Sequence, residues 1–150
     1  MTSYRIHLCG RGSRRPEAAG IRKAVLAALA HEGAAPGELA IVLVNEEQMR
    51  ELSRAYRKKD DSTDVVAFPD GTPDPDSGLL YYGDVAIALP VAEAQAAEAG
   101  HTASAEISLL AVHGVLHLLG HDHATPRDRR RMWAAQTEIL RSVGTKIGSA

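Results

Sequence analysis

One segment of the chain, residues 113–123, has the sequence HGVLHLLGHDH, and its spacing decides how the rest is interpreted. Its apolar residues favour an α-helix that ends at Gly120. Residues four apart on a helix differ by roughly 40° in direction and about 6 Å along the axis, so His113 and His117 project from one side. Gly120 can adopt the left-handed conformation that ends a helix and turns the chain back toward it. The spacing therefore predicts that His123 joins the other two imidazoles.

Three gathered histidines are typical of a catalytic zinc site. Structural zinc sites are usually closed by four protein ligands, whereas catalytic sites keep a place for water or substrate. A histidine pair alone could be a polar interruption on a buried helix, but burying two unpaired imidazoles would cost on the order of 1–3 kcal/mol each. An ion supplies the missing partner. We therefore expect one Zn²⁺ per chain, held by His113, His117 and His123.

The spacing also matches the metzincin protease pattern His-x-x-x-His-x-x-Gly-x-x-His. Those proteases carry a glutamate general base directly after the first histidine, and here that position is Gly114. Peptide hydrolysis is therefore disfavoured. The sequence itself identifies no general base.

The other polar residues near this pattern receive no firm role. His121 is expected to be exposed beside the helix end rather than to bind the ion directly. Asp122 is equally compatible with orienting an imidazole and with a solvated turn. His7, His31 and His101 have no partners at metal-binding spacing, so none is assigned a function.

The hydrophobic periodicity predicts an α+β fold. Strands are expected over residues 4–9, 39–44, 64–68 and 80–89, and helices over 16–33, from Asn45 through Tyr56, over 90–99, 103–119 and 125–143. This order predicts a small mixed sheet of about four strands with helices packed on it. A chain of 150 residues is long enough for one domain, here taken as 1–150.

Local signals refine these boundaries. Asn45 and Gln48 are spaced to form a capping box at the start of the second helix. Pro69 is expected to stop the third strand, and residues 70–78 to form a mobile, solvated loop. Cys9, the single cysteine, is expected to be a buried strand thiol rather than a nucleophile.

Composition limits the classes of function. The chain is 45% hydrophobic and 24% charged, as in soluble globular proteins. It has no signal peptide pattern and no stretch near the roughly 20 apolar residues of a membrane span, so a cytoplasmic location is expected. The net charge of −2 gives no global attraction to nucleic acid. Nucleic-acid binding would depend on local basic clusters.

Two basic clusters are present, one at residues 54–59 and the other at 127–131. Acidic residues interleave with both, so charge alone favours ordinary solvated faces.

Three segments together resemble the YbeY family of bacterial zinc-dependent, single-strand-specific endoribonucleases, which are implicated in ribosomal RNA maturation and ribosome quality control. The resemblance lies in residues 56–69 (YRKKDDSTDVVAFP), residues 83–87 (GDVAI) and residues 113–123, and continues through Met132 and residues 138–140. It implies an α+β, zincin-like fold. It also implies single-stranded ribosomal RNA as substrate and ribosome-associated proteins as partners.

The resemblance carries over to individual residues. His113, His117 and His123 correspond to the family's zinc ligands, and Arg57 falls on the arginine considered important for activity. Ser62 and Ala67 depart from the commonest family pattern, which has proline and serine there, and His121 replaces a frequent tyrosine. Because none of the three is expected to bind the ion, the departures bear on substrate choice.

Two other functions are compatible with the same histidines. One is a metallohydrolase of another class, such as a peptidase, which the metzincin-like spacing suggests and Gly114 argues against. The other is a non-enzymatic ribosome-assembly factor in which zinc only stabilises the fold.

Overall fold

The computed structural model describes residues 3–10, 17–57 and 63–147. In this part of the chain the sheet consists of four strands: β1 (Tyr4–Gly10), β2 (Gly37–Val44), β3 (Val65–Pro73) and β4 (Leu80–Ala88). The helices are α1 (Glu17–His31), α2 (Glu46–Leu52), the short π-helical turn η1 (Ser53–Arg57), α3 (Leu89–Ala99), α4 (Ala103–Leu118) and α5 (Pro126–Ser142). The predicted α+β class with a small mixed sheet is confirmed.

The strand order in the sheet is β1-β2-β4-β3. β1 pairs with β2 and β2 with β4 in parallel, and β3 pairs with β4 in antiparallel fashion. β3 is therefore an edge strand. This explains one wrong prediction: Pro69 does not end the strand, which continues to Pro73, because a proline on an edge strand need not donate to a neighbour.

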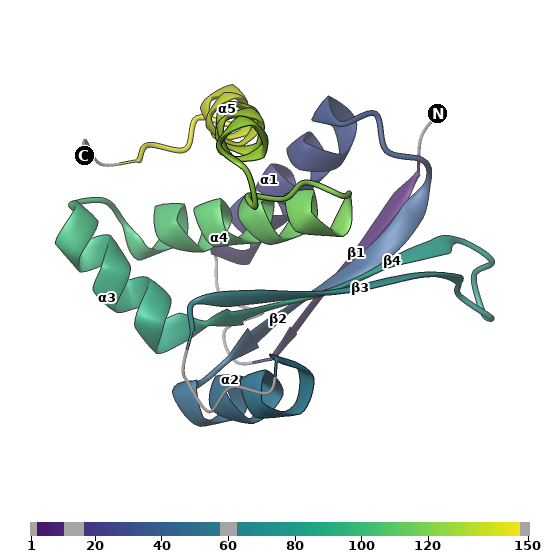
Figure 1. Ribbon diagram of the computed structural model, residues 1–150, viewed down its shortest axis with the longest axis horizontal. Coiled ribbons are helices and arrows are strands. Elements are labelled where there is room, and N and C mark those ends of the chain that lie inside the picture. Colours follow the sequence, from purple (N-terminus) through teal and green to yellow (C-terminus); the bar gives the residue numbers. More distant parts are fainter. Residues whose placement is uncertain (1–2, 11–16, 58–62, 148–150) are drawn as a thin grey trace.

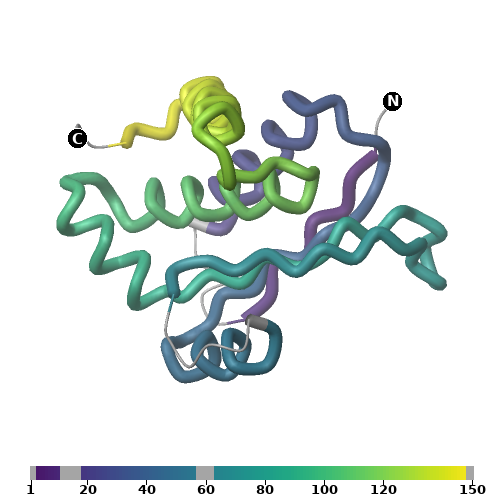
Figure 2. Tube along the Cα trace, in the orientation of Figure 1, coloured from purple at the N-terminus to yellow at the C-terminus, as the bar shows by residue number. Residues whose placement is uncertain are grey.

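Helices cover both faces of the sheet (Figures 1 and 2). α1 and α4 lie on one face, α5 packs on their outer side, and α2 lies on the opposite face. The larger core fills the space between the sheet and the first layer of helices, with fully buried side chains that include Ile41, Val85, Ile87, Val112 and Leu116. A smaller cluster around Met49 lies on the opposite face of the sheet, which α2 covers.

The predicted helix boundaries are largely observed. The capping box forms, because the backbone N–H of Gln48 donates to Asn45 Oδ1 (2.7 Å) and that of Asn45 donates to Gln48 Oε1 (3.0 Å). Thr125 caps α5 by accepting from the backbone N–H of Asp128 (3.1 Å). The predicted start of the first helix, residue 16, lies outside the described residues.

Two local predictions are wrong. Cys9 is exposed, because it lies on the same face of β1 as Arg5 and His7, whereas Ile6 points into the core. Residues 70–78 are not simply a loop, since β3 extends through the first four of them. No helix in the described ranges is long and apolar enough to span a membrane.

Candidate metal centre

α4 presents His113 and His117 on one side of its last turns. The two residues are four apart, and their ring centroids lie 4.8 Å from each other at an angle of 74°. The rest of this part of α4 is apolar and buried, with Val112, Val115 and Leu116 fully inaccessible. Because these side chains fix the helix against the sheet, they also fix the direction in which the two imidazoles project.

Gly120 ends α4 and turns the chain back, as the sequence predicts. Its φ of 101° lies in the left-handed region. The backbone N–H of His121 donates to the Leu116 carbonyl (2.9 Å) and that of Gly120 to the His117 carbonyl (3.1 Å), which is the Schellman arrangement. The returning chain carries His123 to 6.0 Å from the His113 ring and 5.1 Å from the His117 ring, between centroids.

The three histidines fit a metal ion. One nitrogen from each ring can be chosen so that all three lie within 4.8 Å of one another. Nitrogens bound tetrahedrally to zinc at about 2.0–2.1 Å are roughly 3.3 Å apart, so small side-chain rotations suffice. Within the described ranges this group contains no cysteine or carboxylate ligand. Three neutral imidazoles with a free fourth position suit a catalytic zinc or a similar ion.

Gln136 orients the first of these imidazoles. It lies on α5, is 4% exposed, and its side-chain Oε1 is 3.1 Å from His113 Nδ1. An amide oxygen accepts a hydrogen bond, so Nδ1 carries the proton and Nε2 keeps its lone pair for an ion. Outer groups of this kind fix ring orientation in metal sites. Sequence analysis missed Gln136 because it comes 23 residues after His113, on another helix.

The environment keeps two of the imidazoles neutral. Burial lowers the pKa of His113, and the nearby His123 adds to this, although the hydrogen bond with Gln136 and the charge of Asp64 act in the opposite direction. Burial also lowers the pKa of His117, with His113 and His123 contributing. A metal ion needs the neutral form of histidine, so these shifts favour binding near neutral pH.

A cavity of about 470 Å³ opens in front of the histidines. The wall opposite the histidines is formed by Thr63 and Asp64 and by the first residues of β3, 65–67. Asp64 is held in place because its Oδ1 accepts from the backbone N–H of Val65 (2.8 Å) and its carbonyl accepts from that of Ala88 (2.9 Å). A substrate bound at the histidines would therefore contact the edge strand.

Gly114 is required by packing. A Cβ atom at this position would lie 2.4 Å from Cγ1 of Val85 on β4, closer than real contacts allow. The missing glutamate of the metzincin pattern therefore has a structural reason: α4 lies so close to the sheet that a side chain would fit only if Val85 or the helix moved. The general base of those proteases has no counterpart at this position.

His121 and Asp122 have local partners. The ring of His121 is 15% exposed and its Nε2 lies 2.5 Å from a carboxylate oxygen of Glu32 on α1, so the expectation of an exposed ring is wrong. It is not part of the metal-binding group. Asp122 accepts a hydrogen bond from the backbone N–H of His123 (2.7 Å) and so shapes the loop that carries the third histidine.

Arg57 ends the turn η1, and its side chain lies outside the described residues, as do Lys58 and Lys59. The arginines of the second basic cluster, residues 127–131, are exposed on α5.

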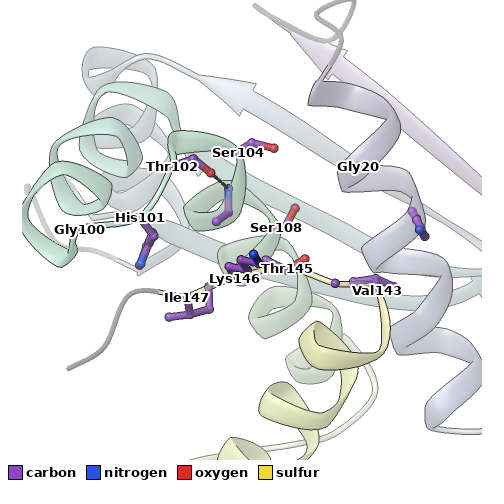
Figure 3. Close-up of a pocket in the computed structure, with 13 residues that line it drawn as sticks. Gly20, Gly100, His101, Thr102, Ser104, Ser108, Val143, Thr145, Lys146 and Ile147 are labelled. Carbon is purple, nitrogen blue, oxygen red and sulfur yellow. Dashed lines mark hydrogen bonds between the residues drawn. The ribbon is translucent and has the colours of Figure 1, made fainter.

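A second cavity of about 500 Å³ lies between α1, the first turn of α4 and residues 143–147 (Figure 3). Its lining includes Lys23, Ser108 and Lys146, and among the described residues that line it His101 is the one of a metal-binding type. The nitrogen of His101 lies 2.6 Å from a carboxylate oxygen of Glu106. This cavity does not bring together the ligand set found at the end of α4.

A mixed four-stranded sheet with a three-histidine cluster at the end of its central helix defines an α+β domain with a candidate metal centre. A solved structure, the solution structure of TM1509 from Thermotoga maritima, shares this fold with a TM-score of 0.66 and 25% identity, covering 92% of this chain and 88% of that one.

The sequence comparisons show the family to which the chain belongs. The family described as Endoribonuclease YbeY matches residues 14–144. The Endoribonuclease YbeY of Stutzerimonas stutzeri is 38% identical over 136 residues, which are 91% of this chain and 84% of that protein. That of Myxococcus xanthus is 46% identical over 104 residues, 69% of this chain but 35% of that longer protein. The chain therefore belongs to the endoribonuclease YbeY family.

Proposed function

We propose that the chain is a zinc-dependent, single-strand-specific endoribonuclease that acts in ribosomal RNA maturation and ribosome quality control, as a single domain spanning residues 1–150. The observation that carries the proposal is the convergence of three imidazoles, in a chain of this family, with nitrogens within 4.8 Å of one another. The substrate is single-stranded ribosomal RNA, and the setting is the cytoplasm, with ribosome-associated proteins as partners.

His113, His117 and His123 would hold one ion per chain. When bound, zinc supplies Lewis acidity at a phosphate oxygen and lowers the pKa of a coordinated water toward about 7. Gln136 accepts a hydrogen bond from His113 Nδ1–H and would thereby leave the lone pair of Nε2 available to the ion. The half-buried site excludes part of the solvent, which strengthens electrostatic interactions with a bound phosphate.

Arg57 is the proposed catalytic residue. Its guanidinium would clamp two phosphate oxygens and stabilise the charge that grows during cleavage. Proton removal does not fall to the metzincin glutamate position, because Gly114 is packed against Val85. Since metal chemistry and charge neutralisation are both needed, loss of either should be severe.

Cleavage of a labelled single-stranded RNA tests this function. We expect His113→Ala, and separately Arg57→Ala, to abolish cleavage while circular dichroism shows an intact fold. Arg50→Ala, on the exposed surface of α2, removes the same charge and should cleave normally. Undiminished cleavage by the His113 or Arg57 variant would contradict the proposal.

Assays on the purified wild-type protein distinguish this function from the two rival functions. A peptidase would cut a protein substrate in the presence of zinc and leave RNA intact, and the packing at Gly114 disfavours it. A zinc-stabilised assembly factor would unfold when metal is removed and would bind RNA without cutting it.

A further inference from the structure

Trp133 is a large aromatic side chain that the fold leaves in solvent. It is the single tryptophan of the chain, lies on α5, and is 56% exposed. Its neighbours Met132 and Gln136 point inward and are almost fully buried. The indole therefore gives only part of its surface to the packing of α5, and more than half of it is open to a ligand.

The indole lines a small cavity next to the metal centre. This cavity, of about 190 Å³, is also lined by Asp64, His113 and Gln136. It shares Asp64, Val65 and His113 with the larger cavity in front of the histidines. An RNA strand bound at the histidines could therefore continue from the larger cavity into the smaller one and contact the indole.

The lining of the small cavity suits an uncharged flat ring. Leu109 and Leu110 supply apolar surface and Asp64 supplies a carboxylate, whereas the carboxylate of Glu106, which also lines the cavity, is paired with His101 (2.6 Å). Carboxylates repel a phosphodiester but accept hydrogen bonds from the amino groups of a base.

We infer that Trp133 is a stacking platform for one nucleobase of single-stranded RNA, the base of a nucleotide adjacent to the phosphate held at the metal centre. The inference rests on the proposed ribonuclease function. Exposed aromatic side chains that stack unpaired bases are a general means of holding single strands. A duplex keeps its bases stacked on one another, so the same platform disfavours double-stranded substrates.

Fluorescence provides a direct test of binding, because all tryptophan emission comes from residue 133. The zinc-loaded Arg57→Ala variant, in which cleavage should be lost while the three histidines are intact, is titrated with a single-stranded RNA oligonucleotide. We expect the emission to be quenched, and a blunt duplex of the same sequence to quench it far less. Equal quenching by both would overturn the inference.

Three variants test the role in cleavage. Trp133→Leu keeps bulk but loses the aromatic face, and we expect kcat/KM for single-stranded RNA to fall about tenfold or more. Trp133→Phe keeps an aromatic face and should remain within roughly threefold of wild type. Leu26→Ala, at an exposed apolar side chain on α1, is the matched control and should cleave normally.

An abasic substrate separates stacking from a structural role. Removing single bases in turn around the cleaved phosphate should identify one position whose loss slows the wild type about tenfold but leaves the Trp133→Leu rate unchanged. Equal slowing of both proteins at every position would overturn the inference, as would a wild-type rate in Trp133→Leu. Failure of the wild type to cleave any RNA would instead overturn the proposed function and the inference together.

Discussion

Gly114 lies so close to Val85 that a Cβ atom on the glycine would sit 2.4 Å from the valine Cγ1. This contact places the histidine-bearing end of α4 directly on strand β4. It also explains why the chain carries the metzincin spacing without the metzincin glutamate: the helix approaches the sheet so closely that a side chain at that position would fit only if Val85 or the helix moved.

Gly114→Ala should destabilise the protein although alanine favours helices. Overpacking of a tight core typically costs about 1–3 kcal/mol, and we expect a loss of this size in the free energy of unfolding measured by urea denaturation of the metal-free protein. The double variant Gly114→Ala/Val85→Ala should be more stable than the sum of the single effects predicts.

Gly20→Ala is the matched control on α1. A Cβ there meets nothing closer than Ser104 Oγ at 3.9 Å. This substitution should stabilise the protein by up to about 1 kcal/mol, as expected for glycine to alanine within a helix. Similar effects at both positions would contradict the proposed close packing of α4.

Gln136 should tune metal affinity without binding the ion. Gln136→Leu removes the acceptor for His113 Nδ1, and loss of such a group typically weakens metal binding about 10- to 100-fold. Competition with a chromophoric chelator measures this change. Gln136→Glu keeps an acceptor and should retain most of the affinity, whereas unaltered zinc binding in Gln136→Leu would remove Gln136 from the site.

His31 should make a small, pH-dependent contribution to stability. Hydrogen bonds to Glu32 and Glu138 raise its pKa above the ordinary value of 6.5, although burial opposes them. A raised pKa in the folded state means that the stabilisation is fully present below about pH 6.5 and is lost as pH rises through the folded-state pKa. Because both ion pairs lie at the protein surface, the contribution of His31 should stay under about 1 kcal/mol.

The measurement compares wild type with His31→Gln, which cannot titrate. The difference in their free energies of unfolding should be larger at pH 6 than at pH 8.5 and should shrink in high salt. The three-histidine cluster is the same in both proteins, so its own pH dependence drops out of the difference. A difference that grows with pH would contradict the assigned direction of the pKa shift.

The sequence predicts much of the metal centre because its signals are local. The spacing of the histidines and the conformational freedom of Gly120 act within eleven residues, and each is observed. The partners of the site are not local: Gln136 reaches His113 from α5, and Val85 explains Gly114 from β4. Such contacts depend on how helices pack on the sheet, which a periodicity pattern does not specify.

One error in the predicted fold has a similar origin in contacts between distant segments, and another does not. Whether Pro69 ends a strand depends on whether that strand lies at an edge, and the edge position follows from the strand order. The exposure of Cys9 could have been predicted. Side chains alternate between the two faces of a strand, and Cys9 lies on the same face as the polar residues Arg5 and His7.

The most direct test of the central claim is a titration of metal-free protein with zinc while single-stranded RNA cleavage is measured. We predict that metal-free protein is inactive and that the rate rises linearly to a plateau at one zinc per chain. Full cleavage without metal, or a plateau at another stoichiometry, would contradict a single catalytic ion held by the three histidines.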